Sequence, residues 1–225
     1  ERFWLLAKKL RDAGIAHIRG DVIIDDTLFN RGAIETPAID GKATRTYNTS
    51  PNALLINFGA TVITVDAEPQ GVRISVDPPT TTLKINNAVT LNNDDCTTKG
   101  RRITLNLQRG KKDSTLTVGG FFPRGCGASS YSRTLLPHGP YVYGVFAGLW
   151  QQLGGTLAGD WRYGPSPSNT RTLAQLESAT LTEVIRYINK FSNNVMARNL
   201  LLSIASEAGA TSATPAHAER LIKAW

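Results

Sequence analysis

Two polar side chains, Ser192 and Asn194, stand two residues apart immediately before a run of apolar residues. A hydroxyl and an amide are groups that can donate and accept hydrogen bonds to a reacting substrate. The residues after them are apolar nearly all round a helix, which predicts a buried helix whose start is a rigid place to hold catalytic groups. The same spacing also suits a structural role in which Ser192 is simply the helix N-cap.

The other residue types that often carry chemistry give no second site. His17, His138 and His217 are scattered and lack the spacing of metal ligands or of a Ser-His-Asp triad. The segment Gly125-Cys126-Gly127 resembles the start of a dinucleotide fingerprint, but the third glycine is absent. We therefore expect neither a metal ion nor a cofactor.

Composition limits the classes of partner without choosing among them. The chain has 225 residues and a formal net charge of +7, which fits a nucleic-acid binder, a membrane-surface protein or a protein that works on a polyanionic polymer. No run approaches the roughly 18 to 20 apolar residues that span a bilayer, so we expect no transmembrane segment.

Basic residues concentrate on one expected hairpin of the middle region. The surrounding strand lacks interleaved aromatic residues for base stacking, which favours a solvated hairpin or a contact with anionic wall polymers over a nucleic-acid partner. The basic residues are Arg101, Arg102, Arg109, Lys111 and Lys112.

The pattern along the chain changes from mixed to β-rich to helical. A helix ending at Gly14 precedes a buried strand within 15–25, and a polar loop covers 30–50. Between Pro51 and Phe122, short β-branched runs separated by turn residues predict an all-β region. These runs are 53–58, 61–65, 72–76, 83–91, 102–107 and 114–118. Helices are expected at 141–153, 180–190 and 195–208, with a short strand within 156–163 and another helix beginning at Thr214-Pro215.

The two ends and the two cysteines leave alternatives open. Glu1 lies inside a helical pattern and Trp225 ends one without a cap, so we expect a chain trimmed at both ends. Cys96 and Cys126 suit one disulfide and two reduced thiols equally well.

Three ordered segments resemble one family. Ser192-Asn193-Asn194-Val195-Met196-Ala197 is similar to the S-x-N motif of class C low-molecular-mass penicillin-binding proteins, the DD-carboxypeptidase and endopeptidase family. The strand that ends in Gly20-Asp21-Val22-Ile23-Ile24-Asp25, with Phe29 after it, and the segment Tyr47-Asn48-Thr49-Ser50-Pro51-Asn52-Ala53-Leu54 also resemble that family. The β-rich region falls between these two segments and Ser192.

The resemblance implies a multidomain α/β fold. It would be part of a penicillin-recognition domain, similar to β-lactamases and transpeptidases, interrupted by β-rich insert domains. We expect the first part of an insert domain at 1–55, a nested β-rich insert at 56–95, the return of the insert domain at 96–128, and the part of the recognition domain that carries S-x-N at 129–225.

The resemblance also implies a penicillin-sensitive serine peptidase that removes D-Ala from peptidoglycan stem peptides through an acyl-enzyme, with or without endopeptidase activity. Ser192 would relay a proton and Asn194 would position the general-base Lys and the substrate. Asp25 and Phe29 would lie near the donor-peptide pocket; without the resemblance they read as a turn residue and a core residue. The S-x-x-K and K-T-G motifs are absent, so the fragment alone is expected to be inactive.

The family is exported, which favours a periplasmic or secreted protein with a Cys96–Cys126 disulfide. Its partners would be stem peptides, with β-lactams as inhibitors. The rival interpretation is a basic, non-catalytic module that binds nucleic acid or wall polymer through the region from Pro51 to Phe122.

Overall fold

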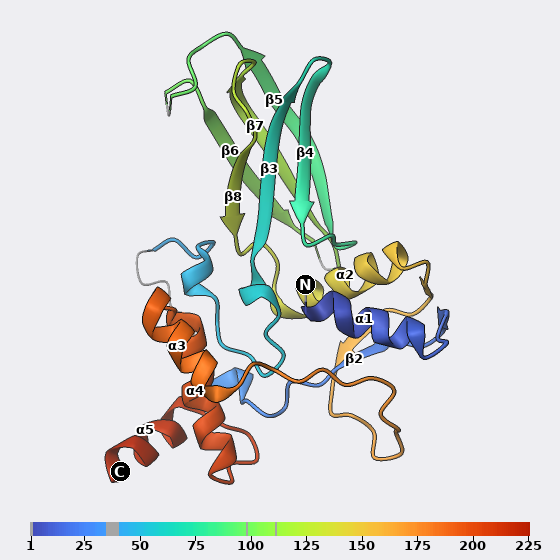
Figure 1. The fold of residues 1–225 in the computed structure, drawn as a ribbon, viewed down its shortest axis with the longest axis vertical. Helices are drawn as coiled ribbons and strands as arrows, with labels where there is room; N and C mark the ends of the chain where they lie inside the picture. The colour runs from blue at the N-terminus through green and yellow to red at the C-terminus, as the bar shows by residue number, and fades with distance from the viewer. Residues whose placement is uncertain (1, 35–40, 98, 111) are drawn as a thin grey trace.

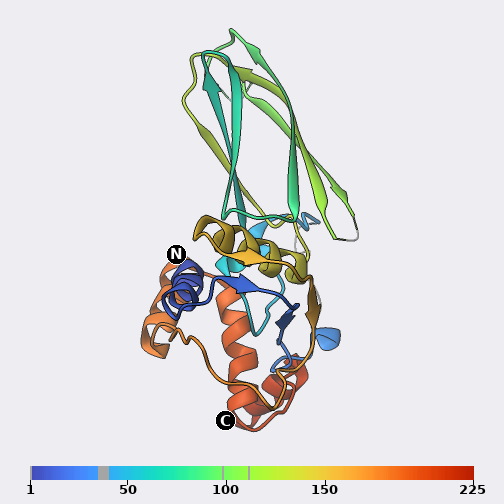
Figure 2. The same cartoon turned by 90° about the vertical axis from the view of Figure 1, so that its right-hand side faces the viewer.

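The β-rich middle of the chain forms two three-stranded sheets that face each other and project from the rest of the fold, which is built of helices and short strands (Figures 1 and 2). The computed structural model describes residues 2–34, 41–97, 99–110 and 112–225. One sheet has the order β4-β3-β8 and is antiparallel; the other has the order β5-β7-β6, with β5 parallel to β7. The strands are β3 (Thr61–Glu68), β4 (Gly71–Asp77), β5 (Leu83–Asn92), β6 (Arg102–Arg109), β7 (Ser114–Pro123) and β8 (Ser129–Arg133).

Alternation along the central strands builds the core between the two sheets. Ile63 and Val65 of β3 face Leu116, Val118 and Phe122 of β7, and all five are fully buried. Since every second side chain of a strand points to the same face, the apolar set lies inside and the polar set lies outside. The predicted all-β region is therefore confirmed, although the expected boundary between residues 95 and 96 falls between β5 and β6, which both pair with β7.

Two details of this region differ from the prediction. The run 53–58 is not a strand, because Asn57 and Phe58 have positive φ values of 43° and 53° within a 3-10 turn, Asn57–Gly59. β8 was not predicted, since its sequence Ser-Ser-Tyr-Ser-Arg lacks the β-branched residues that mark the other strands. As an edge strand beside β3, it needs apolar side chains on one face only.

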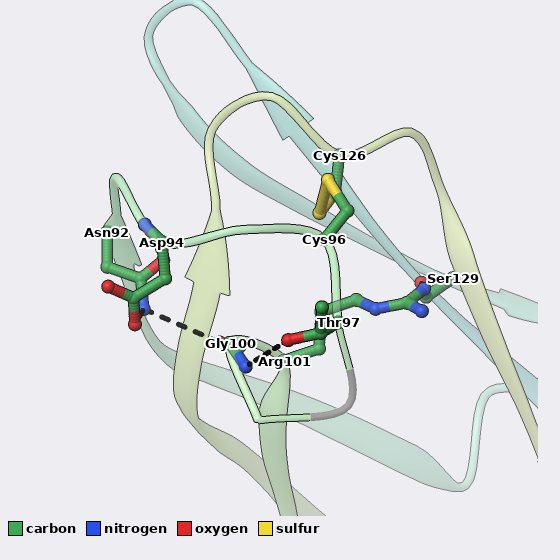
Figure 3. Close-up of a disulfide and its surroundings, with 8 residues drawn as sticks. All are labelled: Asn92, Asp94, Cys96, Thr97, Gly100, Arg101, Cys126 and Ser129. Atoms are coloured by element: carbon green, nitrogen blue, oxygen red, sulfur yellow. Dashed lines mark hydrogen bonds between the residues drawn. A yellow bond between two sulfur atoms is a disulfide. The ribbon is translucent and has the colours of Figure 1, made fainter.

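The confirmed disulfide joins Cys96 and Cys126 at one end of the paired sheets. It connects the segment between β5 and β6 to the segment between β7 and β8 (Figure 3). Arg101 Nη1 donates to Ser129 Oγ at 2.9 Å beside it. The two connecting segments therefore form one cross-linked end of the sandwich.

A small α/β layer lies at the opposite end of the sandwich. The strand expected within 15–25 is two short strands, because Gly20-Asp21 interrupts the pairing. β1 (His17–Ile18) pairs in parallel with β9 (Thr156–Leu157), and β2 (Val22–Ile24) with β10 (Trp161–Tyr163).

Helices α1 (Arg2–Asp12) and α2 (His138–Gln152) pack on each other beside this layer. Phe3 and Phe146 meet edge to face at 6.3 Å between ring centroids. α2 also supports the base of the sandwich, where Thr82 Oγ1 donates to Pro140 O at 2.8 Å. A Cβ at Gly144 would overlap Thr82 Oγ1, so only glycine permits this approach.

Three further helices follow, as predicted: α3 (Leu181–Phe191), α4 (Asn194–Glu207) and α5 (Pro215–Ala224). Thr180 and Glu183 form a capping box at the start of α3, and Thr214 caps α5 with Pro215 in its first turn. None of the helices in the described part of the chain is long and apolar enough to cross a membrane.

Two helices expose more apolar surface than the sequence predicts. α4 buries only Val195, Leu202 and Ala205, so the expectation of a helix buried all round is wrong. α3 is amphipathic but buries no residue, and Tyr187 and Phe191 are 52% and 62% exposed. Ile204 of α4 is 43% exposed as well.

Candidate active site

Ser192 occupies the junction between α3 and α4 in a left-handed conformation, with φ 48° and ψ 44°. The N-cap of α4 is Asn193, whose Oδ1 accepts from Met196 N at 3.0 Å. The interpretation of Ser192 as the N-cap is therefore wrong. A left-handed conformation costs a non-glycine residue about 1 to 2 kcal/mol. Ser192 is instead the C-cap of α3, where its backbone N–H donates to Ile188 O and its side chain is exposed.

Asn194 is the first residue of α4, and its side chain is exposed. Its backbone carbonyl accepts from Arg198 Nε at 3.2 Å. Arg198 Nη2 donates to the carbonyl oxygens of Tyr47 and Thr49, each at 3.0 Å. Partial burial lowers the pKa of the Arg198 guanidinium. The first turn of α4 is therefore bound to the segment 47–49, which brings two of the three family-like segments together.

Asp25 follows β2 and holds a turn. Its Oδ1 accepts from Thr27 Oγ1 at 2.6 Å and from Thr27 N at 3.2 Å, and its Oδ2 accepts from Ser166 N at 2.7 Å. These bonds, that from the Thr27 hydroxyl above all, lower the pKa of Asp25 to about 2. The carboxylate is ionised at neutral pH and has lone pairs left for a cationic or N–H partner.

Phe29 is a core residue, only 4% exposed. It packs in a cluster with Leu202 and Ala205 of α4 and with Ala213 and Ala218 at α5. The backbone beside it is also paired: Asn30 N donates to Ala213 O and Ala213 N donates to Leu28 O, both at 2.9 Å. Phe29 thus fixes the segment after Asp25 on α4 and α5, and its expected place near a peptide pocket stays a prediction.

The four predicted residues fall into two pairs. Ser192 and Asn194 share one helix junction, whereas Asp25 and Phe29 share one segment packed against the same helix bundle. Across the described ranges, no hydrogen bond or ion pair directly joins one pair to the other. Sequence reasoning missed Thr27, although Asp-x-Thr is a spacing typical of a turn in which the carboxylate accepts from the residue two positions on. It also missed Arg198 and Asn199, whose partners are about 150 residues away and leave no local signal.

The basic residues of the expected hairpin do not form one cluster. Arg102 and Arg109 begin and end β6, so an eight-residue strand separates them by about 23 Å. Lys112 pairs with Asp160, and Lys111 lies outside the described residues. A shallow hollow of about 290 Å³ lies at the disulfide end instead. It is lined by Asn92, Asp94, Lys99, Gly100, Arg102 and Phe121, and so lies on the sandwich rather than beside Ser192.

Solved structures show the same fold. Penicillin binding protein 4 (dacB) from Haemophilus influenzae aligns with a TM-score of 0.67 and 19% identity, covering 98% of this chain and 48% of that one. The same protein complexed with a novel β-lactam aligns with a TM-score of 0.63 and 18% identity, covering 98% and 46%. The chain thus spans about half the length of these solved relatives. No curated protein sequence matches it significantly.

The sequence itself identifies the family. The profile of the D-Ala-D-Ala carboxypeptidase 3 (S13) family matches residues 1–224, nearly the whole chain. The resemblance predicted from the S-x-N motif and the two upstream segments is therefore confirmed, as is the mixed α/β fold. With its S-x-N motif at an exposed helix junction and its β-rich region projecting from an α/β base, this chain belongs to the D-Ala-D-Ala carboxypeptidase 3 (S13) family.

Proposed function

We propose that the complete protein is a serine-type D-Ala-D-Ala carboxypeptidase of peptidoglycan stem peptides, with or without endopeptidase activity. The observation that carries this proposal is the family match over residues 1–224 together with the S-x-N motif at the α3–α4 junction. In such an enzyme a serine oxygen attacks the peptide carbonyl, D-Ala leaves with a proton, and water then hydrolyses the ester. A β-lactam would acylate the same serine through opening of its ring, with no group leaving, and so block the site.

Ser192 and Asn194 are proposed to form one wall of this site. The Ser192 hydroxyl would pass a proton toward the amine of the departing D-Ala. The Asn194 amide would hold the general-base Lys and the substrate backbone by hydrogen bonds. The left-handed Ser192 and the Arg198 contact to Asn194 O support these roles, because both residues are held by backbone geometry and leave their side chains exposed.

Asp25 is proposed to contact the donor peptide. Its three hydrogen bonds fix the carboxylate and its lowered pKa keeps it negative, which suits a cationic or N–H group of the substrate. Phe29 would act in this pocket indirectly, by anchoring the same segment to α4.

The nucleophile and the third wall are proposed to lie in the part of the family chain that residues 1–225 do not cover. S-x-x-K and K-T-G do not occur in the sequence, so residues 1–225 alone would not acylate. The exposed faces of α3 and α4 support this proposal, because apolar helix faces are usually covered.

The division into insert and recognition domains and an extracytoplasmic location are also proposals. Pairing of β3 with β8 and of β5 with β7 supports one unit at 61–133. The Cys96–Cys126 disulfide supports an oxidising compartment such as the periplasm.

A covalent-adduct assay tests the proposed function. The full-length protein, incubated with labelled penicillin, should carry one β-lactam as judged by intact mass, and residues 1–225 alone should carry none. Ser192→Ala in the full-length protein should slow acylation by about a hundredfold or more. Asn189→Ala, an exposed change on α3, is the matched control and should acylate normally. A full-length protein without an adduct would refute the function, and an adduct on residues 1–225 would show that they hold their own nucleophile.

A further inference from the structure

A buried carboxylate, Asp26, lies next in sequence to Asp25, the residue proposed to contact the substrate. Asp26 is only 3% exposed, whereas its neighbour Asp25 is partly open to solvent. Asp26 Oδ2 accepts from Asn52 Nδ2 at 2.9 Å and faces Arg31 Nε at 3.1 Å. The Arg31 guanidinium in turn lies 3.5 Å from the centroid of the Tyr163 ring. A carboxylate is withdrawn from water at a considerable free-energy penalty, which these partners offset.

The second partner of this carboxylate connects it to α4. Asn52 N donates to Asn199 Oδ1 and Asn199 Nδ2 donates to Asn52 O, both at 3.0 Å. Asn52 Oδ1 accepts from Leu54 N at 2.8 Å, so every polar group of the Asn52 side chain has a partner. The bonds from Asp26 through Asn52 to Asn199 form a continuous connection that is buried at Asp26 and partly buried at Asn199, and we term it the Asp26–Asn52–Asn199 network.

The network joins the two pairs of candidate site residues. Asp26 directly follows Asp25, and Asn199 lies on α4, five residues after Asn194. Phe29 packs on the same helix, but apolar packing fixes a distance less strictly than directional hydrogen bonds do. Together with the Phe29 cluster and the backbone bonds of Leu28 and Asn30 to Ala213, the network therefore ties the segment of Asp25 to the helix that begins at the Ser192–Asn194 junction.

We propose that Asp26, Asn52 and Asn199 are positioning residues that hold Asp25 at the distance at which it contacts the donor peptide of a substrate bound at Ser192 and Asn194. The inference rests on the proposed function and deepens it, because it predicts a preference for peptides long enough to reach Asp25 and assigns it to residues that touch no substrate. A substrate too short to reach Asp25, or a β-lactam, would not depend on the network. Asp26 is buried in this ion pair while the Arg31 side chain is 46% exposed. A pair that contains a buried charge is often replaceable by apolar residues without loss of stability, so stability alone is a weak reason for its presence.

The test compares three substrates on the full-length protein. Asn199→Ala should lower kcat/KM for a stem pentapeptide by between about tenfold and a hundredfold, the effect of a displacement of about 1 Å in a substrate contact. It should leave kcat/KM for a diacylated D-Ala-D-Ala dipeptide and the rate of acylation by benzylpenicillin little changed. In an Asp25→Asn background, Asn199→Ala should cause no further loss for the pentapeptide, because the network acts through Asp25.

Two further variants keep the result interpretable. Asn199→Asp retains the bond from Asn52 N, so it replaces Asn199→Ala if the latter does not fold. Tyr141→Phe is the control for lost stability, because it removes a buried hydrogen bond from Tyr141 OH to Ala60 O at the base of the sandwich, which involves no residue of the network. It should leave the ratio of pentapeptide to dipeptide kcat/KM unchanged.

The outcomes separate this inference from the proposed function. Equal losses on all three substrates, or additive losses in the Asp25→Asn background, would overturn the positioning role while leaving the carboxypeptidase intact. A wild-type protein that forms no β-lactam adduct would instead remove the proposed function itself.

Discussion

Arg198 Nε donates to the backbone carbonyl of Asn194, and the other end of the same guanidinium bridges the carbonyls of Tyr47 and Thr49. One side chain therefore binds the start of α4 to a segment about 150 residues earlier. Its planar, branched donors suit three carbonyl acceptors at once, which a lysine cannot match.

Replacing this guanidinium should loosen the junction. We expect Arg198→Lys to lower the free energy of unfolding by about 1 to 2 kcal/mol, because partly buried carbonyls lose their donors. Urea unfolding of residues 1–225 measures the change, and Arg186→Lys, an exposed change on α3, serves as the control. An unchanged urea midpoint for Arg198→Lys would show that water replaces the guanidinium without loss.

The left-handed Ser192 predicts opposite effects on stability and activity. Ser192→Gly should raise the free energy of unfolding of residues 1–225 by about 0.5 kcal/mol or more, because glycine adopts φ 48° without the penalty of a Cβ. The same change should abolish most β-lactam acylation of the full-length protein, since the hydroxyl is lost. Ser192→Ala should lose acylation equally but gain no stability. If Gly and Ala variants were equally stable, the conformation at residue 192 would not be strained.

The pKa of Asp25 predicts an acid-dependent loss of stability. Its folded pKa of about 2 lies below the ordinary value of 3.8, so its contribution to stability is present above pH 3.8 and is lost as the pH falls toward 2. In Asp25→Asn, the difference in stability from wild type should therefore shrink between pH 5 and pH 2. Urea midpoints measured across that range test this, and a difference that stays constant with pH would contradict it.

The contact of α2 with the sandwich base predicts a strong effect of one methyl group. Gly144→Ala should destabilise the fold by about 1 to 3 kcal/mol, because the new Cβ overlaps Thr82 Oγ1 and Thr80 Oγ1. Gly125→Ala is the matched control, since nothing lies within 4 Å of its Cβ position. Thermal unfolding followed by circular dichroism compares the two variants. Similar melting temperatures would show that the segment of Thr80 and Thr82 moves away from the new Cβ at little cost.

The disulfide should contribute substantially to stability. Replacing both Cys96 and Cys126 by Ser opens a connection between residues 30 apart, which the chain-entropy treatment values at about 3 to 4 kcal/mol. Urea unfolding under non-reducing conditions gives the difference, and the wild type in reductant should behave like the double variant. A loss below about 1 kcal/mol would mean that the unfolded chain is already restricted at this end.

Local patterns predicted what depends on local chemistry. The glycine after α1, the β-branched runs of β3 and β7 and the start of α5 at Thr214-Pro215 each follow from side chains within a few residues, and the structure has these elements where the sequence indicates them. The sequence also placed Ser192 at the start of a helix. It did not predict the left-handed backbone of Ser192, because that conformation depends on the junction between two helices.

Long-range contacts were beyond sequence reasoning. β8 is a strand because it pairs with β3, and the sequence Ser-Ser-Tyr-Ser-Arg does not indicate that partner. The pairing of Asn52 with Asn199 spans 147 residues, and both asparagines look like ordinary polar positions in the sequence. The solvent exposure of the apolar face of α3 was also not predicted. An amphipathic pattern indicates that a helix face is usually covered, but it does not identify the segment that covers it.

The first and last residues of the sandwich lie side by side. Thr61, the first residue of β3, is paired with Arg133, the last residue of β8, in an antiparallel ladder that brings such partners to about 5 Å. A short turn across that gap would therefore rejoin the flanking chain without altering its path. Residues 61–133 are therefore attached to the rest of the fold as an insertion with adjacent ends, and the order of the flanking elements up to the helix junction at Ser192 does not depend on the length of the inserted region.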